Sequence, residues 1–132
     1  DASLANLALP KRLDVMSSNW PYVQIAGVLC INMIHIAPWS CSAGLISGAA
    51  QVLESNGPLV LYGPFKRNGI HTAPTNETFD RMLQRKNPEW GVRDIEAVEA
   101  IARDVGFDES TAIEMPSNNC CLILRRDIYG LK

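Results

Sequence analysis

The chain has 132 residues, of which 47% are hydrophobic and 20% are charged, and its formal net charge is −2. This length and composition are typical of one globular domain and exclude a disordered chain. The charged residues form no basic patch along the sequence, so we expect no binding to nucleic acid. The longest apolar run, residues 28–37, is about half as long as a membrane-spanning helix, so we expect no membrane association.

The first part of the chain carries only weak patterns. Residues 1–9 are weakly apolar and indicate the remnant of a helix, and residues 12–16 predict a short strand. The sequence SSNWPY that follows is typical of a loop. Because the chain opens without an initiator methionine, at what reads like the tail of an element, we expect it to be the C-terminal part of a longer protein.

The middle of the chain alternates apolar strands with helices. Residues 26–32 are apolar on both faces, which predicts a parallel strand buried between layers of helices. Residues 40–54 predict a helix with Ser40 as its N-cap, followed by Gly57 in a left-handed C-cap conformation. The small residues of this helix, Gly48 among them, are expected to let it lie close on the sheet.

The same alternation continues into the second half of the chain. Residues 58–65 predict a second buried strand, and residues 66–76 predict a long polar loop of the kind that often carries function. Helices are predicted over residues 77–86 and 94–106. The segment between them, residues 90–93, is expected to fold over the same end of the sheet as the loop.

Two further strands are predicted over residues 111–115 and 120–126. The short connection PSNN permits only an antiparallel pair, and the last strand, apolar on both faces, is expected to be central. The element order predicts an α/β fold with a mostly parallel sheet and a C-terminal antiparallel hairpin. Such a hairpin argues against a nucleotide-binding oxidoreductase and is usual in class I S-adenosylmethionine-dependent methyltransferases.

The four cysteines are expected to be small buried hydrophobic residues in a reducing compartment. Their spacing fits no zinc pattern, so no metal site is predicted. We therefore expect an intracellular protein of the cytoplasm or the nucleus. The cysteines are Cys30, Cys41, Cys120 and Cys121.

Several sequence stretches resemble one family in their order. They are LDV, NWP, CINMIHIAPW, YGPFKRNGIHTAPTNETFD, NPEWGVRDIEAVEAIA and EMPSNN, and together they resemble the methyltransferase-like 26 family from about residue 6 to residue 126. The resemblance implies a Rossmann-like class I methyltransferase fold that binds S-adenosylmethionine. It also implies methyl transfer to an unidentified small-molecule acceptor.

The chain departs from this family at its front. The Gly-rich loop and the acidic residue that members carry after their first two strands do not occur in these residues. We therefore expect residues 1–132 to form one methyltransferase-like domain, the C-terminal two-thirds of a family member, that is inactive on its own. The alternative is a non-catalytic interaction module or a truncated isoform without cofactor binding. A strand edge left bare by the missing part favours self-association.

The resemblance also implies which residues bind the cofactor. Asp14 would accept a hydrogen bond from the adenine amino group, and Val15 would pack on the adenine ring; the alternative for Asp14 is a turn that caps the loop at Ser17. Asn32 would meet the methionine part of the cofactor, because ligands bind beyond the carboxyl ends of strands in such sheets. The expected cofactor-binding residues are Asp14, Val15, Asn32, Met33 and Ile34.

The acceptor is expected at the same edge of the sheet. Since side chains alternate along a strand, the first buried strand is expected to end near Asn32, so that His35 faces the pocket. His35 is a candidate catalytic base, a contact residue, or a core histidine with local partners. Tyr62 is a second catalytic candidate or a half-buried strand residue, and Trp39 is a packing lid or a substrate platform. The expected substrate-binding residues are His35, Trp39, Tyr62, Phe65, His71, Thr72 and Asn76.

Overall fold

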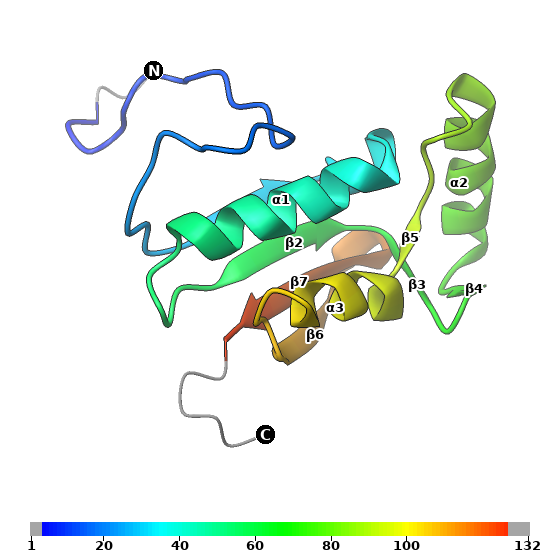
Figure 1. Cartoon of the computed structure of the whole chain (residues 1–132). Helices are drawn as coiled ribbons and strands as arrows, with labels where there is room; N and C mark the ends of the chain where they lie inside the picture. Colours follow the sequence, from blue (N-terminus) through cyan, green and yellow to red (C-terminus); the bar gives the residue numbers. More distant parts are fainter. Residues whose placement is uncertain (1–3, 127–132) are drawn as a thin grey trace.

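The computed structural model describes residues 4–126, which form two small sheets and three α-helices (Figure 1). The main sheet has the order β1-β2-β7-β6 and consists of β1 (Val28–Ile31), β2 (Leu59–Gly63), β7 (Asn119–Arg125) and β6 (Glu109–Met115). The second sheet has the order β4-β3-β5 and consists of β4 (Ile70–His71), β3 (Phe65–Arg67) and β5 (Arg93–Asp94). The helices are α1 (Trp39–Val52), α2 (Pro74–Lys86), α3 (Ile95–Arg103) and the 3-10 turns η1 (Ile34–Ile36) and η2 (Pro116–Asn118).

The main sheet is mixed, so the prediction of a mostly parallel sheet is wrong. In this sheet β1 and β2 pair in parallel, whereas β2 with β7 and β7 with β6 are antiparallel. The reason is the tight turn η2, which returns the chain as a hairpin and inserts β7 beside β2 in the opposite direction. The expected central position of the last strand is confirmed, because β7 lies between β2 and β6.

The core lies on one face of the main sheet, where α1 and α3 are packed (Figure 1). The opposite face of β1 is open: Leu29 and Ile31 are 63% and 57% exposed. The expectation that the first strand is buried on both faces is therefore wrong, because the described residues leave this face of β1 uncovered. β1 is also an edge strand, which pairs only with β2 among the described residues. The buried residues of the core include Leu45, Ile46, Ala49, Leu59, Leu61, Val98, Ala102, Phe107, Leu122 and Leu124.

The ends of α1 differ from the prediction. The helix begins at Trp39 after Pro38, so Ser40 is not its N-cap, and the chain is extended again at Leu53. Gly57 does not take the left-handed conformation. It is needed for another reason: a Cβ on Gly57 would lie 2.7 Å from the carbonyl oxygen of Ala26.

The residues before β1 form turns and irregular chain. The helix remnant expected over residues 1–9 is absent from the described residues 4–9, and residues 12–16 are not a strand. This segment is held against α1 by Trp20, which is buried and packs on Gly48. The sequence predicted that the small residue at position 48 lets the helix lie close on the sheet. In the structure it makes room for Trp20 of this segment instead.

Adding a methyl group at Gly48 is expected to destabilise the fold. A Cβ there would lie 2.1 Å from the indole Cε2 of Trp20. We expect Gly48→Ala to lower the free energy of unfolding by about 1–3 kcal/mol through overpacking, partly offset by the higher helix propensity of alanine. Urea denaturation followed by Trp fluorescence measures the change, with Ser47→Ala at the exposed neighbouring position as the control. Equal stability of the two variants would contradict this packing.

The predicted loop over residues 66–76 is largely ordered structure. Asn68 and Gly69 both have positive φ, at 52° and 74°, and connect β3 to β4 as a tight hairpin turn. Helix α2 then begins at Pro74, three residues earlier than predicted, and it stands beside the body of the molecule (Figure 1). Within residues 4–126, no helix is long and apolar enough to cross a bilayer.

Candidate functional site

The candidate site lies at the carboxyl ends of β1 and β2. Strand β1 ends at Ile31, and Asn32 turns the chain with a φ of 54°, which confirms that the strand ends near this residue. The backbone N–H of Asn32 donates to the carbonyl of Tyr62 at 2.9 Å. The side chains of Asn32 and His35 lie next to Gly63, where a Cβ would be 3.2 Å from Asn32 Oδ1 and 3.3 Å from His35 Cε1.

His35 is the most unusual side chain at this edge. It is 3% exposed, and its ring makes an edge contact with Phe79 at a centroid distance of 5.6 Å. Within the described part of the chain, no group forms a hydrogen bond with its ring nitrogens. Burial, followed by the positive charge of Arg93, lowers the pKa of His35. The ring is therefore a neutral imidazole at neutral pH.

A shallow hollow opens beside this ring. Its walls come from the turn after β1, the end of β2, the first turns of α2 and the hairpin turn before β7. None of the lining side chains is charged. The residues that line it are Asn32, His35, Ile36, Pro64, Thr75, Asn76, Phe79, Ser117 and Asn119.

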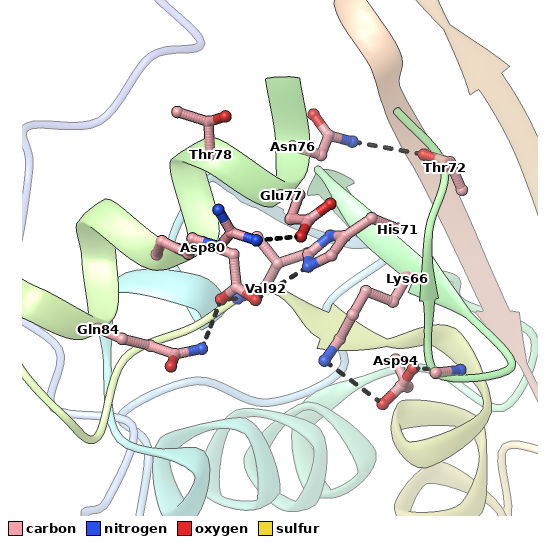
Figure 2. A network of polar contacts seen from close by, with 12 residues as sticks. Lys66, His71, Thr72, Asn76, Glu77, Thr78, Asp80, Gln84, Val92 and Asp94 are labelled. Atoms are coloured by element: carbon pink, nitrogen blue, oxygen red, sulfur yellow. Dashed lines mark hydrogen bonds and ion pairs between the residues drawn. The ribbon is translucent and has the colours of Figure 1, made fainter. Parts of the chain in front are cut away.

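Asn76 links α2 to the β6–β7 hairpin. Its Nδ2 donates to the carbonyl of Asn118 at 3.1 Å and to Thr72 Oγ1 at 3.4 Å, the latter drawn in Figure 2. In return, Asn118 Nδ2 donates to Thr75 Oγ1 at 3.5 Å. The predicted substrate residue Asn76 therefore lines the hollow and also fastens its two walls together.

The segment Gly91–Arg93 holds the turn that carries His35, and the expected folding of residues 90–93 over this edge is confirmed. Gly91 N donates to the carbonyl of His35 at 3.0 Å. The Arg93 guanidinium donates to the carbonyls of Ile34 at 3.2 Å and Ala37 at 2.8 Å. It also lies 5.5 Å from the ring centroid of Trp39, which packs against the core and does not line the hollow.

A second polar cluster centres on Asp80, a residue for which the sequence analysis had no role. Asp80 is 6% exposed, and its Oδ2 lies 3.1 Å from Nε2 of His71. Its Oδ1 accepts hydrogen bonds from Val92 N at 2.9 Å and from Gln84 Nε2 at 3.0 Å (Figure 2). The available signal was the spacing of Asn76, Asp80 and Leu83, which places two polar residues on the buried side of α2.

Two of the predicted substrate residues lie in other surroundings. His71 is engaged by Asp80, and its Nδ1 is buried without a partner among the described residues. Tyr62 is a half-buried strand residue whose position in β2 alternates with the core residue Leu61. Neither lines the hollow beside His35.

Phe65 and Thr72 line a second hollow, which shares Asn119 with the hollow beside His35. Phe65 is buried in the core, and this hollow also contains the charged residues Arg67 and Glu114. Of the three substrate-binding residues predicted in the long loop, Asn76 lines the hollow beside His35, whereas His71 and Thr72 do not.

The expected cofactor residues are spread over the structure. Asp14 is exposed, and its Oδ1 accepts a hydrogen bond from Met16 N at 2.9 Å while its carbonyl accepts one from Ser17 N at 3.0 Å, as in the turn alternative. Val15 lies against α1, where a Cβ on Gly44 would be 2.8 Å from its carbonyl oxygen. Met33 packs against the core and Ile34 is buried in it, so Asn32 is the member of the set that lines the hollow.

The buried histidine makes the stability of the fold depend on pH. The pKa of His35 is lowered from 6.5 in the folded chain, so near and below that pH the unfolded chain binds more protons. We expect the free energy of unfolding to be highest above about pH 7 and to fall as the pH decreases through about 6.5. Urea denaturation at a series of pH values measures the slope, and His35→Gln should lose this part of it. An unchanged slope in that variant would contradict the assignment to His35.

The fold is similar to part of several solved methyltransferase structures. It superposes on an O-methyltransferase family protein from Burkholderia thailandensis with a TM-score of 0.74 and 14% identity, over 88% of this chain and 35% of that chain. Human N-acetylserotonin methyltransferase in complex with S-adenosylmethionine gives a TM-score of 0.74 at 9% identity, over 88% and 33% of the two chains. The S-adenosylmethionine-dependent methyltransferase SibL gives 0.71 at 16% identity, over 88% and 35%.

The chain therefore shares part of the fold of the methyltransferases with which it superposes, and it spans about a third of their length. The chain belongs to the family described as "Protein of unknown function (DUF938)", whose model matches residues 1–126. Within residues 4–126, no three His, Cys, Asp or Glu side chains are grouped so that they could hold a metal ion.

Proposed function

We propose that the chain forms the acceptor side of an S-adenosylmethionine-dependent methyltransferase and that His35 takes the proton from a hydroxyl group of a small molecule. The observation that carries this proposal is the buried, neutral His35 ring, which lines an uncharged hollow and has no hydrogen-bond partner in the described residues. Its position at the carboxyl ends of β1 and β2 is where ligands bind in open α/β sheets. The superposition on an O-methyltransferase family protein supports a hydroxyl acceptor.

The residues around the hollow suit an uncharged acceptor. Phe79, Pro64 and Ile36 offer apolar contact, while Asn32 and Asn119 offer amide groups that can orient a hydroxyl. Bound S-adenosylmethionine would supply an electrophilic methyl group. The task left to the protein is to align the acceptor oxygen and to remove its proton, and His35 is the group we assign to the second step.

For the cofactor we propose one contact close to this site and two farther from it. Asn32 lines the hollow at the end of β1 and would meet the methionine part, flanked by the backbone of Met33 and Ile34. Asp14 and Val15 stay the proposed adenine contacts, supported by the exposed carboxylate of Asp14. Within the DUF938 family, the order of the motifs supports a methyltransferase-like 26 protein. The four free cysteines among the described residues support a reducing compartment, the cytoplasm or the nucleus.

The second candidate function is a non-catalytic interaction module. The open edge of β1, with Leu29 and Ile31 exposed, favours this alternative because an unpaired strand edge can pair with another chain or with a second copy. Sedimentation of the chain over a range of concentrations tests self-association. Replacing Leu29 by lysine should prevent it if the edge is responsible.

Calorimetry with S-adenosylmethionine separates the two functions. We expect weak or no binding to the chain of residues 1–132 and clear binding to a version extended at its N-terminus. The extended version is then incubated with a panel of small hydroxylated compounds, and release of S-adenosylhomocysteine is measured. Absence of cofactor binding at millimolar concentration in the extended version would rule out the methyltransferase proposal.

A further inference from the structure

Asp80 is connected to the candidate site through a short segment, Gly91–Arg93, and does not itself touch the hollow. It is almost completely buried and bonded on three sides, to His71, Gln84 and Val92. Figure 2 shows the His71 and Gln84 side chains converging on its carboxylate, next to the backbone of Val92. A buried carboxylate is costly unless its oxygens are bonded in this way, so its position is closely specified.

The contacts continue from Asp80 to His35 through one short segment. Val92 N donates to Asp80 Oδ1 at 2.9 Å, and the preceding residue donates from Gly91 N to the carbonyl of His35 at 3.0 Å. The following residue, Arg93, donates to the carbonyls on both sides of His35, those of Ile34 and Ala37. Gly91–Arg93 is therefore bonded to Asp80 on one side and to the His35 turn on the other.

The approach between Asp80 and this segment is close. A Cβ on Gly91 would lie 3.1 Å from Asp80 Oδ1, so the glycine lets the carboxylate reach the neighbouring Val92 N–H. No other hydrogen bond of the Val92 N–H is present in the described residues. Without the carboxylate, the buried N–H of Val92 would have no acceptor. The segment could then satisfy this donor only by moving to a position where water can accept the hydrogen bond.

We propose that Asp80 is a positioning residue: its carboxylate holds Gly91–Arg93 in place, and through this segment it keeps the His35 ring buried at the hollow. The inference rests on the proposed function only for the catalytic role of His35. Its structural content, which is the dependence of the His35 position on the bond from Val92 to Asp80, stands apart from methyl transfer.

Two variants of Asp80 distinguish the effect of its negative charge on His35 from its effect on the position of Gly91–Arg93. Asp80→Asn removes the negative charge but keeps an Oδ1 acceptor for Val92 N, whereas Asp80→Ala removes both. Loss of the charge alone should lower the pKa of His35, because the nearby Arg93 loses a group that offsets its positive charge. Loss of the position should expose the ring to water and raise its pKa toward 6.5. The two effects therefore have opposite signs.

Nuclear magnetic resonance can follow the His35 ring directly, because the chain has two histidines. We expect Asp80→Asn to leave the pKa of His35 at or below its wild-type value, with slow amide exchange at Val92. We expect Asp80→Ala to raise this pKa and to speed the exchange of Val92 about tenfold or more. Glu77→Gln, on the exposed side of α2, is the matched control that should change neither readout.

The proposal is overturned if Asp80→Ala leaves both readouts at wild-type values, or if Asp80→Asn raises the pKa of His35. The second outcome decides the matter even when Asp80→Ala does not fold, because the asparagine variant keeps the hydrogen bond. Neither readout involves methyl transfer. Failure of the enzyme assays with both readouts as expected would therefore count against the proposed function and leave the position of His35 explained.

Discussion

Replacing His35 by glutamine is expected to lower the rate of methyl transfer by about 10²- to 10⁴-fold, the usual contribution of a general base. Glutamine has a similar size and can form hydrogen bonds, but it cannot take up a proton at neutral pH. Affinity for S-adenosylmethionine should stay within about twofold of wild type, because only the proton transfer is removed. Initial rates of S-adenosylhomocysteine release in the extended version, with the acceptor identified by the panel, measure the effect.

The control for this prediction is His71→Gln. His71 does not line the hollow, and its replacement leaves the hydrogen bonds from Gln84 and Val92 to Asp80 in place, so it should cost much less activity. Equal losses in the two variants would contradict a base role for His35. The wild-type rate should also rise as the pH increases through the lowered pKa of His35, since only the neutral ring can accept a proton.

Truncating Leu122 is expected to cause the largest loss of stability among the strand residues. Its side chain is 0% exposed, and it pairs with Leu61 of β2 and Ala112 of β6 in the centre of the sheet. We expect Leu122→Ala to lower the free energy of unfolding by about 2–5 kcal/mol, because transfer free energy is lost and a cavity is left. Urea denaturation measures the change.

Ile123→Ala is the matched control for this prediction. Ile123 is the next residue of the same strand, and its side chain is half-buried on the face of the sheet opposite to α1 and α3. We expect it to cost clearly less than Leu122→Ala, because water already reaches part of the site. Equal costs in the two variants would mean that the second face of the sheet is covered as well as the first.

The parts of the fold that could be predicted were those with a strong local pattern. The apolar run over residues 120–124 identified β7 as a central strand, and its short connection to β6 required an antiparallel pair. The same kind of run over residues 26–32 gave a wrong prediction of burial for β1, because an apolar sequence does not determine whether other elements cover both faces of a strand. The Asn68-Gly69 pair is a strong hairpin signal, but the polar composition of residues 66–76 around it is typical of a loop.

The candidate site could be predicted only where it follows from the end of a strand. The turn at Asn32 and the inward position of His35 came from the alternation of side chains along β1. Asp80 could not be found in this way, because its partners are set by the packing of α2 against distant backbone. Its bond to Val92 joins residues twelve positions apart, and no spacing rule connects them.

The central position of β7 has a consequence for synthesis of the chain. Strand β6 pairs with β7 and with no other described strand, and β2 reaches β6 only through β7. While a ribosome is still translating the stretch up to Asn119, the nascent chain can therefore form the β1–β2 pair but has no continuous sheet. The inner edge of β2 stays open until β7 emerges, and a chaperone that binds extended apolar segments has this interval in which to act.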